Sequence, residues 1–150
     1  MKKAILILAV AAALAAALAG CGGGNADPKP APPTGEAVIH AWTEAMYRGD
    51  YDKAARYFAK DALVQQVETI VLRTHEDAVA FGRSLPCRAK VTSIKAEKNG
   101  VLLATFDLFP GVGGTCPDGG NARVRFFIRK GMIETFHQLP DQPTPPGQTS

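Results

Sequence analysis

The dipeptide Asn99-Gly100 constrains the fold of this chain more than any other feature of the sequence. It separates two segments that are rich in β-forming residues, 90–98 and 101–109. A type I′ turn needs two residues that tolerate positive φ, and Asn followed by Gly meets this need best. The sequence therefore predicts an antiparallel hairpin in the second half of the chain.

Two further strands are expected at residues 122–130 and 132–139, joined by a tight turn at Lys130-Gly131. A long glycine-rich loop, residues 110–120, connects the first hairpin to these strands. No helical pattern follows this loop, so it lacks the geometry that cradles a phosphate group. The second half of the domain is thus expected to be an antiparallel sheet.

The preceding segment has helical periodicity. A first helix is predicted at residues 36–48, because apolar side chains recur there on one face, namely Val38, Ala41, Trp42, Ala45 and Met46. Thr34 or Gly35 is expected to cap this helix, and Gly49 to end it. Asp50 is a natural N-cap for a second helix, which is predicted from Tyr51 to about Phe58 or Ala59.

A short strand is predicted at residues 60–67, and a third helix begins at Thr74. Asp77 follows Thr74 by three residues, which is the spacing of a capping box with Asp in the place of Glu. The third helix is expected to end between residues 82 and 86. Three helices and a set of antiparallel strands predict an α+β domain with helices on one face of the sheet.

Two segments resemble the nuclear transport factor 2-like (NTF2-like) superfamily, including its SnoaL-like and ketosteroid-isomerase-like branches. They are AWTEAMYRGDYDKAARYFAKDALVQQ, residues 41–66, and RFFIRKGMIETFHQLP, residues 125–140. The resemblance covers nearly all of the domain, residues 35–140. It implies a cone, in which three N-terminal helices pack on a curved, mainly antiparallel sheet around a central pocket.

The isomerase branch uses a Tyr on the first helix, a carboxylate base after the first strand and a buried acid on a later strand. Carried over by position, these residues fall on Trp42, on Gln66 and on Arg123 or Val124. None of these side chains does the corresponding chemistry. The resemblance therefore implies a domain without the isomerase site, and no catalytic residue, metal ligand or cofactor is assigned.

A pocket remains compatible with the sequence. Its candidate lining residues are Trp42, Tyr57, Phe58, Gln66, Phe81, Phe106, Phe126 and His137. The simpler interpretation is that these aromatic side chains fill the interior as core. A dyad of His137 with Asp107 across the sheet is a further hypothesis, and it would suit an isomerase, dehydratase or cyclase with a rewired pocket.

The N-terminal residues 1–20 have the pattern of an export signal: Lys2-Lys3, an apolar run and small residues before a junction. The junction LAGC, residues 18–21, resembles the lipobox of bacterial lipoproteins. This resemblance implies that Cys21 is acylated, with palmitate as one expected chain, and that the mature protein is anchored to the membrane on its extracytoplasmic side.

Two segments outside the domain are rich in proline. Residues 21–34 are expected to form a Gly- and Pro-rich tether, and residues 141–150 are expected to form a disordered Pro-rich tail.

Assigning Cys21 to the lipid leaves Cys87 and Cys116. Two cysteines in an exported domain most simply form one disulfide. The chain has no Cys-x-x-Cys and no paired His spacing, so a zinc site is not predicted.

The net charge of the chain indicates which partners are expected. The formal net charge of +3 falls to +1 without Lys2 and Lys3. The densest basic group is Arg123, Arg125, Arg129 and Lys130, and this small local charge favours a solvated strand face over a nucleic-acid site, so no nucleic-acid binding is predicted. The predicted partners are the membrane, through the N-terminal lipid, and either a small apolar ligand or a protein of the cell envelope. A homodimer through the open sheet face is left open.

Overall fold

The computed structural model describes residues 31–111, 116 and 120–140. The export signal, Cys21, most of the tether and the C-terminal tail lie outside these residues. The elements follow the order α1 (Gly35–Tyr47), α2 (Tyr51–Ala55), β1 (Phe58–Gln65), β2 (Thr69–Leu72), α3 (His75–Ser84), β3 (Cys87–Ala96), the short 3₁₀ turn η1 (Lys98–Gly100), β4 (Val101–Pro110), β5 (Asn121–Arg129) and β6 (Met132–Gln138).

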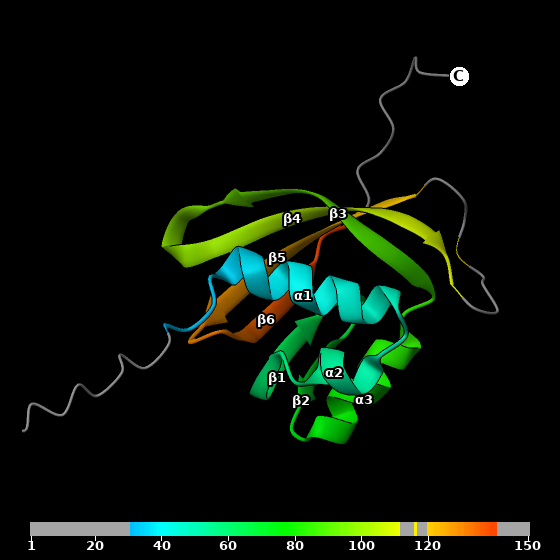
Figure 1. The fold of residues 1–150 in the computed structure, drawn as a ribbon, viewed down its shortest axis with the longest axis horizontal. Coiled ribbons are helices and arrows are strands. Elements are labelled where there is room, and N and C mark those ends of the chain that lie inside the picture. Colours follow the sequence, from blue (N-terminus) through cyan, green and yellow to red (C-terminus); the bar gives the residue numbers. More distant parts are fainter. Residues whose placement is uncertain (1–30, 112–115, 117–119, 141–150) are drawn as a thin grey trace, which may run out of the picture. The chain divides into compact units, whose positions relative to one another are not determined.

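The six strands form one curved sheet in the order β2-β1-β6-β5-β4-β3. All neighbouring strands are antiparallel except β1 and β6, which run parallel because helices and strands intervene between them in the chain. Figure 1 shows α1 lying along one face of the sheet, with α2 and α3 beside β1 and β2. The predicted α+β fold is confirmed, with a mixed sheet.

The two predicted hairpins are present, with different loops. Lys130 and Gly131 have φ angles of 53° and 78° and lie between the paired residues Arg129 and Met132, as a two-residue type I′ turn requires. Asn99 and Gly100 also have positive φ, 60° and 75°. Their connection is two residues longer than predicted, because β3 ends at Ala96 and both Glu97 and Lys98 belong to the connection.

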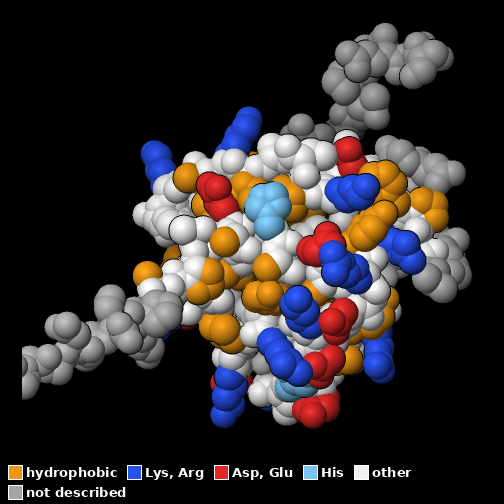
Figure 2. All heavy atoms as spheres, in the orientation of Figure 1, with side chains coloured by type: hydrophobic (Ala, Val, Ile, Leu, Met, Phe, Trp, Pro, Cys, Tyr) orange, Lys and Arg blue, Asp and Glu red, His pale blue; other side chains and the backbone are white. Residues whose placement is uncertain are grey.

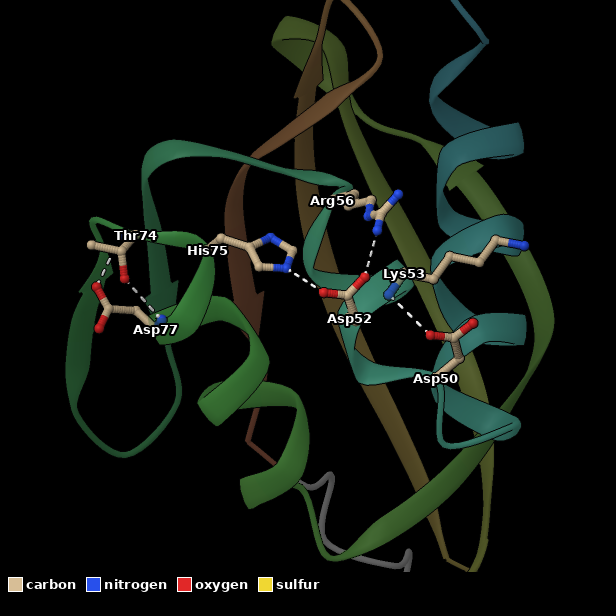
Figure 3. Close-up of polar contacts among 7 residues, drawn as sticks. All are labelled: Asp50, Asp52, Lys53, Arg56, Thr74, His75 and Asp77. Atoms are coloured by element: carbon tan, nitrogen blue, oxygen red, sulfur yellow. Dashed lines mark hydrogen bonds and ion pairs between the residues drawn. The ribbon is translucent and has the colours of Figure 1, made fainter.

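The predicted helix caps are confirmed. The Thr34 and Asp50 side chains accept hydrogen bonds from the backbone N–H groups of Ala37 and Lys53, at 3.2 and 3.1 Å. Thr74 and Asp77 form the reciprocal capping box, which is drawn in Figure 3. The hydrogen bond from the Thr74 backbone N–H is the main cause of the lowered pKa of Asp77.

The predicted end of the second helix is wrong, and one strand was not predicted. The second helix ends at Ala55, and Phe58 begins β1, where it pairs with Ile133 of β6. The backbone N–H of Ile133 also donates to the Tyr57 carbonyl at 2.7 Å, so pairing with the last strand overrides the local helical pattern. The strand that was not predicted is β2, which pairs with β1.

The core is an aromatic cluster between α1, α3 and the sheet. Its rings meet edge to face, with centroids 5.3 to 6.3 Å apart, and belong to Trp42, Phe58, Phe81, Phe106, Phe126 and Phe136. This geometry is the one that aromatic quadrupoles favour.

Within the described residues, no helix has the length and the apolar character needed to cross a lipid bilayer.

Candidate functional site

A cavity of about 250 Å³ lies beside the aromatic core, between α1 and the sheet. The described residues that line it come from α1, the segment before β3 and five strands or strand ends. They are Trp42, Gln66, Leu85, Pro86, Cys87, Ala89, Phe106, Leu108, Ala122, Val124, Phe136 and Gln138. Most of this lining is apolar, which suits an apolar ligand.

Two amides are the polar side chains of the described lining. The Nε2 atom of Gln66 donates to Oε1 of Gln138 at 2.6 Å. Both residues also line a surface groove, together with Val64, Val67, Glu68, Ile70, His137, Leu139 and Pro140. The amide pair thus lies where the cavity and the groove meet, and it offers a hydrogen-bonding end to an otherwise apolar space.

The structure divides the candidate pocket residues into three groups. Trp42, Gln66 and Phe106 line the cavity. Phe58, Phe81 and Phe126 are buried in the aromatic core and are absent from the described lining, so for them the core interpretation applies. Tyr57 is half-buried and packs against the core, and His137 lines the surface groove.

The small residues that leave space for the cavity were not predicted from the sequence. Ala89 on β3 and Ala122 on β5 line the cavity, as does Phe136 on β6. Strand alternation was the available signal, because Ala89 lies two residues after Cys87 and therefore shares its face. Which inward-facing alanine leaves a void depends on the side chains opposite, which the sequence does not specify.

The disulfide closes one end of this region. Cys87 and Cys116 are bonded, with Cα atoms 5.1 Å apart, as predicted. Cys87 lines the cavity and Cys116 is 7% exposed. The bond therefore fixes the middle of the glycine-rich loop against the cavity wall.

The hypothesis of a His137–Asp107 dyad is wrong. His137 pairs with Arg125 on β5, and Arg125 pairs with Leu103 on β4. Asp107 lies further along β4, opposite Asn121. The two side chains are therefore separated both across the strands and along them. Among the described residues that line the cavity, none is ionisable.

Charges of both signs are interspersed on the surface, as Figure 2 shows for one face. On β5, Arg125 binds Glu97 through two hydrogen bonds of 2.7 and 3.2 Å, and Arg129 binds Glu134 at 2.7 Å. The hydrogen bond from Arg125 lowers the pKa of Glu97 and raises that of Arg125. Two of the arginines on this strand thus already have carboxylate partners.

A separate polar cluster joins α2 to α3 on the surface (Figure 3). Asp52 accepts a hydrogen bond from Arg56 at 2.6 Å, and its other oxygen lies 2.8 Å from Nε2 of His75. The contact with His75, and then that with Arg56, hold the pKa of Asp52 below its ordinary value of 3.8. Asp52 and His75 line a groove that is separate from the cavity.

A pH dependence follows from the lowered pKa of Asp52. Its contribution to stability is fully present above pH 3.8 and is lost as the pH falls through the lower value of the folded state. We expect Asp52→Asn to lower the urea midpoint at pH 5, and we expect the difference from the native protein to be smaller at pH 2.5. Midpoints that differ equally at both pH values would contradict this assignment.

No family model matches the chain, and no curated protein matches it. Solved structures do match the chain. An NTF2-like protein of unknown function from Cytophaga hutchinsonii superposes with a TM-score of 0.59 at 13% identity, over 75% of this chain and 94% of that one. The fold is NTF2-like.

Two other NTF2-like neighbours have functional descriptions. A protein proposed to be a ketosteroid isomerase, from Kribbella flavida, has a TM-score of 0.56 at 17% identity, over 74% of this chain and 82% of that one. A protein proposed to be a polyketide cyclase, from Sinorhizobium meliloti, has a TM-score of 0.55 at 16% identity, over 69% and 94%. At these identities the likeness concerns the fold alone.

Proposed function

We propose that this NTF2-like chain is a lipid-anchored, extracytoplasmic binding protein that holds a small apolar ligand. The observation that carries the proposal is the cavity beside Trp42, whose described lining is apolar apart from the Gln66–Gln138 amide pair. Ligand sites usually combine an apolar lining with a few placed polar groups in this way. The volume of about 250 Å³ suits a ligand smaller than an ordinary drug molecule.

The anchor rests on the sequence. Residues 18–21 have the lipobox pattern, and residues 22–30 continue it with the glycines and prolines of a tether. The Cys87–Cys116 disulfide is consistent with an oxidising compartment, since such bonds are rare in the cytosol. The anchor would place the domain at the membrane surface. An apolar ligand dissolved in that membrane would then be close to the cavity.

Binding is favoured over catalysis by the side chains at the cavity. An isomerase, dehydratase or cyclase of the NTF2-like type needs a group that moves a proton within reach of the ligand. Trp42 and Gln66 occupy positions where the isomerase branch has its Tyr and its base, and His137 lies in the outer groove. The amide pair orients a ligand without exchanging protons with it.

A cavity-filling substitution tests the proposal. We expect the mature protein to bind 1-naphthol, an apolar bicycle with one hydroxyl, in calorimetric titration. Ala89→Phe places a ring in the cavity and is expected to weaken binding at least about tenfold.

Ala96→Phe is the matched control, because Ala96 is an exposed alanine of the same strand. It should leave binding unchanged. Native mass spectrometry of the protein from its own membrane would show whether a ligand copurifies. Equal affinity in both variants, or no binding together with no copurified ligand, would contradict the proposal.

A further inference from the structure

Two cations lie over aromatic rings where α1 ends and β3 begins. Lys90 Nζ lies 5.1 Å from the centroid of the Tyr47 ring and 5.5 Å from that of Phe109. The guanidinium carbon of Arg88 lies 5.5 Å from the Tyr47 centroid. We call Tyr47, Arg88, Lys90 and Phe109 the cation–aromatic cluster. It joins the end of α1 to the edge strand β3 and its neighbour β4.

The two cations have no carboxylate partner within the described part of the chain, whereas Arg48, Arg56, Arg125 and Arg129 each form an ion pair. Asp107 is the cross-strand neighbour of Lys90, and it forms no ion pair with it. An aromatic ring attracts a cation without neutralising its charge. The cluster therefore presents two positive charges beside apolar ring surface, and Phe109 is 38% exposed.

We propose that the cation–aromatic cluster docks on the anionic phospholipid headgroups of the membrane to which the chain is anchored. This rests on the lipid anchor proposed above. Lys and Arg near an anionic bilayer are attracted by its surface potential. Tyr is enriched at the membrane–water interface, where an apolar ring and a polar tip are both accommodated. The cluster combines both kinds of group on one side of the domain.

The tether is long enough for this contact. Residues 22–30 separate Cys21 from Ala31, the first described residue, and any chain of nine residues reaches about 30 Å when it is fully extended. The cluster lies at the far end of α1, and a helix of 13 residues is about 20 Å long. An anchored domain can therefore turn this end towards the bilayer without stretching the tether.

Docking at this end would also orient the cavity. Cys87 and Ala89 line the cavity and alternate along β3 with Arg88 and Lys90. The cavity wall and the two cations of the cluster therefore come from neighbouring residues of one segment of the edge strand. The bilayer would then lie close to the cavity, on the side of the disulfide.

Quenching by brominated lipids tests the docking. Full-length lipidated protein is reconstituted in vesicles of phosphatidylcholine with brominated phosphatidylglycerol. Phe109→Trp is compared with Val71→Trp, because both native residues are 38% exposed and Val71 lies on the opposite edge strand. Trp42, the single native tryptophan, gives the same background in both. We expect quenching at position 109 to exceed that at position 71 by at least about twofold.

The charge dependence is tested in the same system. Arg88→Gln with Lys90→Gln in the Phe109→Trp protein should remove the excess quenching, because each cation strengthens contact with an anionic surface about fivefold. Equal quenching at positions 109 and 71, or quenching that the two Gln substitutions leave unchanged, would overturn the docking. Mass spectrometry of the N-terminal peptide tests the anchor separately. An unmodified Cys21 would overturn the anchor and the docking together, whereas an acylated Cys21 without excess quenching would overturn the docking alone.

Discussion

Replacing Trp42 by alanine is expected to lower the free energy of unfolding by about 3–5 kcal/mol. Trp42 is 4% exposed, and its indole meets the rings of Phe58, Phe126 and Phe136 at centroid distances of 6.2, 5.9 and 5.7 Å. Truncation removes this buried surface and leaves a void that the surrounding strands cannot fully close. Urea unfolding followed by circular dichroism measures the loss.

Two further variants show whether the effect belongs to this position. Trp42→Phe keeps a ring in the cluster and should cost clearly less than Trp42→Ala. Phe109→Ala removes a ring of the partly exposed surface, 38% exposed, and should also cost much less. A Trp42→Ala protein with a midpoint close to that of Phe109→Ala would show that the aromatic cluster does not carry the stability assigned to it.

Trp42 also connects the core to the proposed function. Its indole fills the interior between the aromatic core and the cavity. The void that remains is bounded by small side chains, Ala89 and Ala122, on the other side.

The parts of the fold that the sequence predicted depend on residues close together in the chain. The caps at Thr34, Asp50 and Thr74 need a side chain and an N–H group three residues later. The turn at Lys130-Gly131 needs only two residues with positive φ. Such signals are complete within four positions, so a single sequence contains all the information that decides them.

The parts that the sequence did not predict depend on distant residues. Phe58 becomes a strand residue because Ile133, at the other end of the domain, pairs with it. Thr69–Leu72 becomes a strand because β1 offers an edge. Asp107 and His137 are kept apart by the register of β4 with β5 and of β5 with β6. The cavity has the same origin, since it exists only where inward-facing small residues of several strands meet.

Removing the disulfide is the second substitution with a large expected effect. Cys87 and Cys116 are separated by 29 positions, and closing a loop of this length constrains the unfolded chain by about 3–4 kcal/mol. We expect the double variant Cys87→Ala/Cys116→Ala to lose about this much free energy of unfolding. The caps and the β5–β6 turn, which lie outside the closed loop or form locally, should persist in the folded variant.

Reductant provides the control. A reducing agent should lower the urea midpoint of the native protein to that of the double variant, and it should leave the midpoint of the double variant unchanged. A loss below about 1 kcal/mol would show that the unfolded chain is not restrained as the loop length predicts. Because Cys87 lines the cavity, 1-naphthol binding in the folded double variant adds a functional readout. Weaker binding there would mean that the disulfide holds the cavity wall in place as well as stabilising the domain.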